Sequence, residues 1–353
     1  MKLEKLCAKG KSSLRQKDLL NDGPYPVYGA SGVIGTISTF QNDAPYVCVV
    51  KDGAGVGRAM KCRAHSSVLG TMQALIPNKG INCDYLLHLV RSLKLGEGFT
   101  GSTIPHIYFR DYGKRLVPVF PYEQQIAIAS MLNGIEALVD QRKLMLRKYD
   151  SLVKSRFIEM FGDIDDTIYE VKRIQDCCER IKDGTHQTPS YVEEGDNSYL
   201  FLSSKNVVRR AIDWSTAKYI PEALHRELHS RVSPRKGDIL LAKNGTTGIC
   251  AIVDRDCVFD IYVSLALIRP LGFMDSTYFW AAINADRTKR QFDSRLKGVG
   301  VPNLHLGEIR ETLIVVPPLN LQKQFAAFAA QVDKLRFAGN HEMNFRCERF
   351  TLS

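Results

Sequence analysis

Short apolar runs that end in glycine-rich turns form the clearest pattern along the chain. The run YVCVV, residues 46–50, leads into KDGAGVGRA, residues 51–59, where glycine occupies three alternate positions. In a phosphate-binding loop the next element would be a helix whose N-terminus faces the anion. The residues after Gly57 instead show no helical stripe and end in the apolar run 72–76, which predicts a second strand. A turn between two strands is therefore the preferred interpretation, and a nucleotide loop is the alternative.

The same pattern occurs a second time. The run DILLA, residues 238–242, precedes KNGTTGICA, residues 243–251, and strand-like residues follow. Residues 99–125 also align with residues 296–322 at a constant offset, which pairs Pro105 with Pro302 and Gln125 with Gln322. A repeat of this length indicates a duplicated domain rather than a solenoid. Because the second turn keeps only part of the glycines, the turn is a fold element, and the nucleotide-loop alternative loses most of its support.

A long amphipathic helix is predicted after each copy. Residues 122–161 contain no proline and a single glycine, Gly134, and Gly162 stands where the helix would stop. Apolar residues recur three or four positions apart in this segment and at matching positions of the second copy, with Arg142 as a polar interruption. These helix–helix and partner-interface candidates are Ile128, Met131, Ile135, Leu138, Met145, Tyr149, Leu152, Phe325, Phe328, Val332 and Leu335.

A helix with one apolar stripe needs a partner to bury that stripe. We predict that the two helices, the first about 60 Å long, pack on each other like a coiled coil. Docking of each helix on its own domain is the alternative. The expected fold is α+β, with the layout domain, long helix, domain, long helix. The predicted boundaries are residues 1–119, 120–162, 163–317 and 318–353.

Composition narrows the class of protein. The chain has 353 residues, a net charge of +10 and a sequence pI near 9.1. No apolar run has the roughly 20 residues of a membrane span, and the first residues do not resemble a signal peptide. Nine cysteines without a CxxC pair favour a reducing cytoplasm. The basic charge is compatible with nucleic acid or an acidic partner, but does not decide between them.

Several segments together resemble the DNA specificity (S) subunit of type I restriction-modification systems. They are YPVYGASGVIG (25–35), GSTIPHIYFRDY (101–112), KGDILLAKNGTTG (236–248) and the P-x-x-x-Q motif at the start of each long helix. The resemblance extends over about residues 1–335. It implies two target-recognition domains, each of which reads one half of a bipartite site in double-stranded DNA. It also implies a long antiparallel helix pair that fixes the distance between the half-sites.

The resemblance further implies how the work is divided among subunits. The S subunit has no catalytic centre and directs adenine methylation and DNA cleavage by methyltransferase (M) and restriction (R) subunits. We therefore expect no cofactor in this chain, because S-adenosylmethionine, ATP and Mg would belong to the partners. We also expect no contact with a membrane.

Polar and basic side chains in the two turn regions are the DNA-binding candidates. Lysine and arginine on phosphates would supply affinity that falls with salt, and contacts to base edges would supply specificity. The candidates are Lys51, Arg58, Ser102, Thr103, His106, Lys243, Asn244, Thr246, Lys297 and Asn303. Any one of them could instead be a turn former or a solvated loop side chain.

The last residues depart from the pattern of the resembled family. After Leu335 the heptad is lost, since Glu342 and Arg346 occupy the positions that match Met145 and Tyr149. Gly339 also interrupts the segment. We therefore expect an atypical distal helix that is shortened or frayed.

Two other motifs are candidate sites of chemistry. HRELH, residues 225–229, places two histidines at i and i+4, where they could share a metal on a helix. Glu227 is misplaced for a zinc protease, and the sequence suggests no third ligand, so we predict a surface helix and no metal site. VVPPLN, residues 315–320, lacks the flanking residues of an amino-methyltransferase motif. The functional alternatives are an autonomous S-adenosylmethionine-dependent DNA methyltransferase and a duplicated protein-interaction scaffold.

Overall fold

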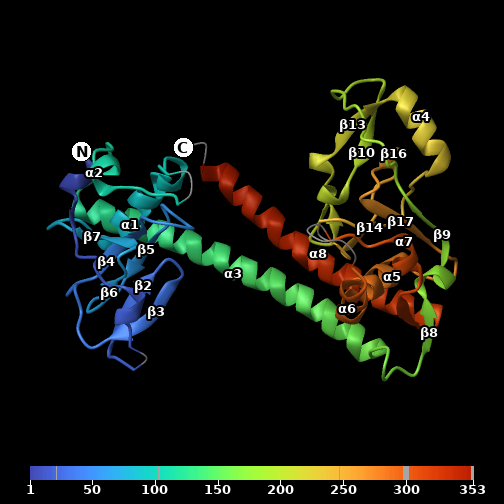
Figure 1. Cartoon of the computed structure of the whole chain (residues 1–353), viewed down its shortest axis with the longest axis horizontal. Helices are drawn as coiled ribbons and strands as arrows, with labels where there is room; N and C mark the ends of the chain where they lie inside the picture. Colours follow the sequence, from blue (N-terminus) through green and yellow to red (C-terminus); the bar gives the residue numbers. More distant parts are fainter. Residues whose placement is uncertain (21, 102–103, 246, 297–301, 351–353) are drawn as a thin grey trace. The chain divides into compact units, whose positions relative to one another are not determined.

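The computed structural model describes residues 1–20, 22–101, 104–245, 247–296 and 302–350, with side chains described as far as Arg336 in the last helix. The chain divides into two compact units, Met1–Lys143 and Leu144–Ser353. Helix α3 (Tyr122–Phe161), predicted over the same residues, passes from the first unit into the second (Figure 1). In the described part of the chain, no helix combines the length and apolarity needed to cross a membrane.

The first unit contains two sheets and a covering helix. One sheet has the strand order β1-β7-β4-β5, all antiparallel, and the other has the order β3-β2-β6, with β2 and β6 parallel. The elements before α3 are β1 (Cys7–Lys9), β2 (Tyr25–Gly29), β3 (Gly32–Ile37), β4 (Tyr46–Val50), β5 (Ala59–Cys62), β6 (Ser67–Val68), β7 (Met72–Pro77), α1 (Cys83–Ser92), α2 (Phe109–Tyr112) and the 3-10 turns η1 (Leu3–Lys5), η2 (Gln16–Asp18) and η3 (Leu95–Glu97).

The second unit repeats this plan with insertions. Its strands are β8 (Glu170–Arg173), β9 (Cys178–Asp183), β10 (Ser198–Leu202), β11 (Val207–Val208), β12 (Ala211–Ile212), β13 (Lys218–Pro221), β14 (Ile239–Ala242), β15 (Cys250–Ile252), β16 (Phe259–Ile261), β17 (Leu265–Pro270) and β18 (Leu313–Val316). Its helices are α4 (Glu222–Arg231), α5 (Ser276–Ile283), α6 (Asp286–Ser294), α7 (Leu306–Arg310), α8 (Leu319–Phe350) and the 3-10 turns η4 (Ile174–Cys177), η5 (Ser204–Asn206) and η6 (Trp214–Thr216).

Strand order confirms the duplication. The sheet β9-β17-β14-β15 of the second unit matches β1-β7-β4-β5 of the first, and every pairing in both is antiparallel. The sheet β13-β10-β16 matches β3-β2-β6, and in each the central strand has one antiparallel and one parallel neighbour. The predicted α+β architecture with two copies of one domain is therefore confirmed.

The central strand of each copy is buried on both faces. In β4, Val47 and Val49 join the core under α1, whereas Tyr46, Cys48 and Val50 join the core toward β6. Strand β14 alternates in the same way between two apolar clusters. Since successive side chains of a strand point to opposite faces, a strand between two cores is apolar throughout. This explains the unbroken runs YVCVV and ILLA.

The turn after β4 joins two strands, as predicted. Gly53, Gly55 and Gly57 have φ values of +85°, +86° and +83°, in the left-handed region that favours glycine. Strand β5 follows directly, and β4 pairs with β5 in antiparallel register. A Cβ on Gly57 would also lie 2.6 Å from the Cα of Gly96. These glycines are therefore required by the backbone path and by close packing.

A buried glutamine fixes the start of each long helix to its domain. Gln125 accepts a hydrogen bond from the N–H of Asn82 (2.9 Å) and donates to the carbonyls of Gly80 and Phe120. Gln322 accepts from the N–H of Asp275 (2.8 Å) and donates to the carbonyls of Phe273 and Pro317. Asn82 and Asp275 are the N-cap residues of α1 and α5. The glutamine of the P-x-x-x-Q motif thus ties the long helix to the N-terminus of a domain helix in both copies.

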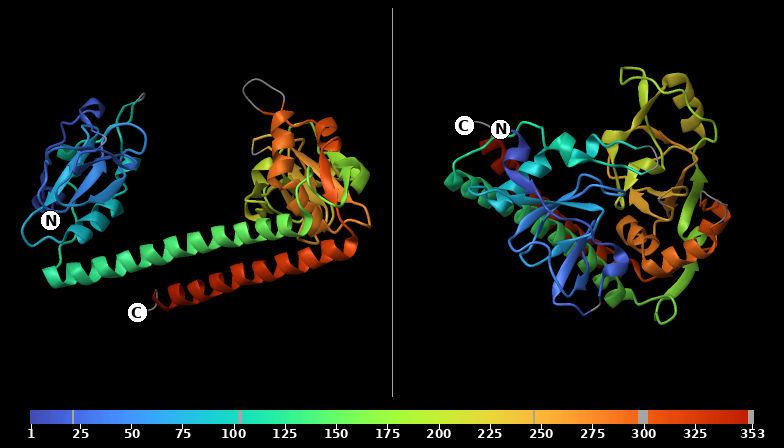
Figure 2. Two further views of the ribbon diagram at one scale, coloured as in Figure 1. Left: turned by 90° about the horizontal axis from the view of Figure 1, so that it is seen from below. Right: turned by 60° about the vertical axis from the view of Figure 1, so that its left-hand side comes forward.

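Within the second unit, the end of α3 runs antiparallel to α8 (Figure 2). Phe157 and Phe161 of α3 stack edge-on against Phe325 of α8, with ring centroids 5.5 and 5.8 Å apart. Farther along the pair, Arg336 donates to Asp150 at 2.6 Å. The predicted packing of the two helices is thus seen here, and α8 together with α3 also closes the main core of this unit.

The line of contact differs from the predicted seam. Phe325 and Val332 are buried as expected, but Leu152 is 46% exposed and its neighbour Val153 packs against the core. The predicted position Leu335 is also exposed. The heptad rule placed the contact at Leu152, whereas packing against both α5 and α8 turns the face of Val153 and Phe157 inward. Most of the remaining predicted residues on α3 are exposed: Met131, Ile135, Leu138 and Met145.

Helix α8 continues farther than expected. Its backbone is helical from Leu319 to Phe350, beyond both the loss of the heptad and Gly339. It has 32 residues, against 40 in α3, so it is the shorter of the two. A helix can tolerate one glycine at a cost of about 1 kcal/mol, which is why Gly339 alone does not end it.

Candidate nucleic-acid interface

In the first unit, the turn after β4 is joined to the segment that leads into α2. The N–H of Ile107 donates to the carbonyl of Lys51 (2.9 Å), and the N–H of Gly53 donates to that of Pro105 (2.9 Å). Asp52 accepts a hydrogen bond from Nδ1 of His106 at 2.8 Å. The turn and the segment around His106, far apart in sequence, therefore form one surface.

The predicted residues of this surface differ in their surroundings. Lys51 is half-buried, and Arg58 is exposed, with its guanidinium donating to the carbonyl of Ala30. Nδ1 of His106 faces the carboxylate of Asp52, so Nε2 is the ring nitrogen left for another contact. Ser102 and Thr103 lie outside the described residues.

An aromatic and cationic stack extends this surface, and the sequence interpretation missed it. The ring of Tyr108 lies nearly parallel to that of His106, at 16° and a centroid distance of 6.4 Å. The guanidinium of Arg110 lies 4.8 Å from the centre of the Tyr108 ring. Tyr108 is 45% exposed. Because Arg110 lies in α2 whereas His106 and Tyr108 precede this helix, neither strand nor helix periodicity in the sequence could have revealed the stack.

The second unit repeats the backbone join. The N–H of Leu304 donates to the carbonyl of Lys243 (3.0 Å), and Asn244 forms a β-bridge with Asn303. These contacts match those of Ile107 with Lys51 and of Asp52 with His106. Asn303 Oδ1 is buried and has no hydrogen-bond partner among the residues that the structure describes. Thr246 and Lys297 lie outside the described residues.

The side chain of Lys243 is not exposed, as the expected contact with a DNA phosphate would require. Its side chain is 7% exposed, and its ammonium lies 2.7 Å from a carboxylate oxygen of Asp183 on β9. A buried cation that is already paired is costly to separate from its carboxylate. We therefore assign Lys243 to holding the turn against the sheet, while Lys51 remains a candidate for DNA contact.

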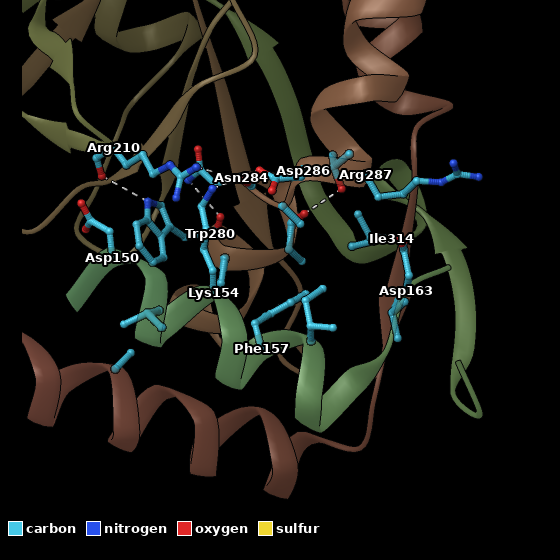
Figure 3. A pocket seen from close by; sticks show the side chains of 18 of the residues that line it. Asp150, Lys154, Phe157, Asp163, Arg210, Trp280, Asn284, Asp286, Arg287 and Ile314 are labelled. Atoms are coloured by element: carbon cyan, nitrogen blue, oxygen red, sulfur yellow. Dashed lines mark hydrogen bonds and ion pairs between the residues drawn. The ribbon is translucent and has the colours of Figure 1, made fainter. Parts of the chain in front are cut away.

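A cavity of about 520 Å³ lies in the second unit between the end of α3, helices α5 and α6, and α8 (Figure 3). Trp280 lines it and donates to the carbonyl of Arg210 at 3.1 Å. Several of the charged residues around it are paired, as in Lys154 with Asp286 (3.1 Å). Arg210 also lines the cavity and donates to the carbonyl of Asn284 (3.4 Å).

Comparison with known proteins identifies the family. The family described as type I restriction modification DNA specificity domain matches residues 168–344. The specificity subunit of the type I restriction enzyme MjaVIII from Methanocaldococcus jannaschii is 24% identical over 280 residues. That match covers 70% of this chain and 64% of the relative, so the chain spans slightly less than two thirds of that relative's length.

Two solved structures share the fold. The crystal structure of the type I restriction-modification S subunit from M. genitalium superposes with a TM-score of 0.60 at 15% identity, over 100% of this chain and 94% of that one. A structure from work on complex assembly and conformational transition of the type I R-M system gives a TM-score of 0.54 at 15% identity, over 99% and 94%. Since the family match covers half of the chain, the chain belongs to the type I restriction-modification DNA specificity domain family.

Proposed function

We propose that this chain is the DNA-recognition subunit of a type I restriction-modification complex and reads a bipartite site in double-stranded DNA. Family membership supports the DNA-recognition role. One observation supports the bipartite site: in both units the turn after the central strand is hydrogen-bonded to a segment distant in sequence. The N–H of Ile107 donates to the carbonyl of Lys51 in the first unit, and the N–H of Leu304 donates to that of Lys243 in the second. One chain with two equivalent loop surfaces can read two separate short sequences.

The first-unit surface has the chemistry for reading DNA. Lys51 and Arg58 would contact phosphates, which gives affinity and its dependence on salt. The stack of His106, Tyr108 and Arg110 offers a flat π-face and a guanidinium, which suit contacts with bases and with guanine edges respectively. In the second unit, Asn244 is half-buried and offers an amide, the group that pairs with adenine edges, whereas the buried Oδ1 of Asn303 does not suit such a contact.

Helices α3 and α8 would act as spacer and docking element. The 40 residues of α3 correspond to about 60 Å of helix. Met131, Ile135 and Leu138 are exposed on it, and Met131 reaches 64%. An exposed apolar stripe of this kind indicates a protein contact, and we assign it to helix pairing and to the methyltransferase subunits.

Chemistry would be carried out by partner subunits. In this proposal the M subunits bring S-adenosylmethionine, the R subunits bring ATP and Mg, and the complex works in the cytoplasm. Two thiols of this chain suit a noncatalytic role, since burial raises the pKa of Cys177 to about 11 and that of Cys83 to about 11. A thiol with such a pKa stays protonated near neutral pH and is a poor nucleophile.

Selection from a pool of random duplexes tests the recognition role. The chain, bound to its M subunits, would be used to enrich duplexes, and the selected pool would be sequenced. We expect two short motifs at one fixed separation, and binding that falls steeply with salt. If no duplex sequence is enriched although the chain binds the M subunits stably, the result would instead support the protein-interaction scaffold. Binding of S-adenosylmethionine by the chain alone would support the autonomous methyltransferase.

A further inference from the structure

Helix α4 and strand β16 bring two histidines and an aspartate together in the second unit. His225 and His229 lie one turn apart on α4, and Asp260 lies on β16, which pairs with β10. One ligand atom from each residue lies within 4.8 Å of the others. Asp260 was absent from the sequence interpretation of HRELH because it is more than thirty residues away, and only the fold brings it beside the helix.

Two atoms of this cluster are spaced like ligands of one ion. His229 Nδ1 and Asp260 Oδ1 are 3.4 Å apart, within ion-pair distance for a protonated imidazole, but both atoms are buried and neither makes a hydrogen bond of ordinary geometry in the described part of the chain. Two ligands of a tetrahedral ion with bonds of about 2.0–2.1 Å lie about 3.3 Å apart. Buried polar atoms without a partner are uncommon in native proteins. An ion between these two atoms would satisfy both.

The third group is held firmly in place. His225 Nδ1 lies 2.6 Å from Asp260 Oδ2, and the ring of Tyr199 stacks on the His225 ring at a centroid distance of 3.7 Å. An ion bound at this nitrogen would take the place of the proton between His225 and Asp260, since imidazole ligands are deprotonated. His229 is about one-third exposed, which leaves a route for an ion and a water molecule.

We propose that His225, His229 and Asp260 form a site for a divalent transition-metal ion, best matched by Zn²⁺, which fastens α4 to the sheet β13-β10-β16. Two imidazoles, a carboxylate and a water molecule are a donor set that Zn²⁺ accepts in tetrahedral geometry. Among the described residues, the apolar cluster between α4 and this sheet has three buried side chains, Phe201, Ile220 and Leu228. A bound ion would add a fixed contact to this small cluster.

The site belongs to the second unit alone. Between the matching strands β3 and β4 of the first unit, the described residues contain no helix. The metal therefore supports an insertion that distinguishes the second domain, and the proposal does not depend on the chain's role in DNA recognition.

Cobalt titration of the full chain tests the site. The purified protein would be freed of metal with a chelator and titrated with Co²⁺, which gives visible d–d bands in a tetrahedral site. We expect one equivalent to bind, without the thiolate charge-transfer band that a cysteine site would show. His229→Gln should weaken binding by more than about tenfold, and the exposed histidine variant His305→Gln should leave it unchanged.

Thermal unfolding gives a second readout. In the full chain, Zn²⁺ should raise the Tm of the wild-type protein and of His305→Gln, but not that of His229→Gln. If His225→Gln fails to fold, the more exposed position 229 still decides the question. Absence of Co²⁺ binding, binding that survives His229→Gln, or a thiolate band would each overturn the proposal.

Discussion

A lysine follows the central strand of each copy, but the two lysines have different surroundings. Lys51 is half-buried at the turn of the first unit, whereas Lys243 is buried against Asp183. The same residue type at the same position is therefore available for the proposed DNA contact in one copy and holds the fold together in the other. Burial and pairing distinguish the two roles.

Methionine substitutions separate these roles. Lys51→Met should weaken DNA binding by the assembled complex and reduce the magnitude of the slope of log affinity against log salt by about 1, the contribution of one phosphate contact. The free energy of unfolding should change little. Lys243→Met leaves Asp183 without its cation and should lower the free energy of unfolding by about 1–3 kcal/mol. Salt-dependent binding and chemical denaturation measure the two effects. Equal effects of both variants on unfolding would contradict the assignment.

Two glycines of the first turn differ in what surrounds them. Gly57→Ala combines a strained φ with a clash against Gly96 and should destabilise the first unit by more than about 3 kcal/mol. Gly53→Ala meets nothing within 4 Å and should cost only about 1 kcal/mol, the backbone component. Chemical denaturation of both variants compares them. If Gly57→Ala is as mild as Gly53→Ala, the close approach to Gly96 is not rigid.

At the scale of elements, the glutamine at the start of each long helix is the clearest structural device. Gln125→Ala removes a side chain that bonds Asn82, Gly80 and Phe120, and should destabilise the first unit by about 2–4 kcal/mol. Gln124→Ala, one residue earlier and exposed, should change stability by less than about 0.5 kcal/mol. Hydrogen exchange at the N-terminus of α1 checks whether the loss is local. If Gln125→Ala leaves hydrogen-exchange protection at the N-terminus of α1 unchanged, Gln125 does not hold the start of α3 to α1.

The exposed apolar stripe of α3 leads to a prediction about assembly. Ile135→Lys places a charge on the face that we assign to protein contact, and should weaken binding to the M subunits at least about tenfold. Gln141→Lys adds the same charge at another exposed position of α3 and serves as the control. Quantitative pull-down with M subunits compares the two. Equal affinity of both variants would remove α3 residues 131–138 from the interface.

The sequence predicted elements more reliably than contacts. The two domains, the strand–turn–strand unit and α3 follow from the repeat, from glycine positions and from helical periodicity, all of which are local signals. The exposure of Leu152, the pairing of Lys243 with Asp183 and the approach of Asp260 to His225 depend on strands and helices that meet only in the fold. Spacing along one element carries no information about such neighbours.

At the scale of the whole molecule, the duplication is the central fact. Two copies with the same sheet orders present the same kind of turn, joined to the same kind of distant segment. The differences between them, such as α4 and the buried Lys243, lie around this common frame. Under the proposed function, such an arrangement would let each half-site be specified independently while the frame is kept.

Mapping of DNA methylation tests this account most directly. The chain would be expressed with its cognate M subunit in a host without DNA methylation, and modified adenines would be located by sequencing. We predict one split motif, two short defined halves around a fixed undefined gap, and variants of the Lys51 surface should alter only one half. A single continuous motif, or no methylation by a complex that still assembles, would contradict the claim that this chain reads a bipartite site.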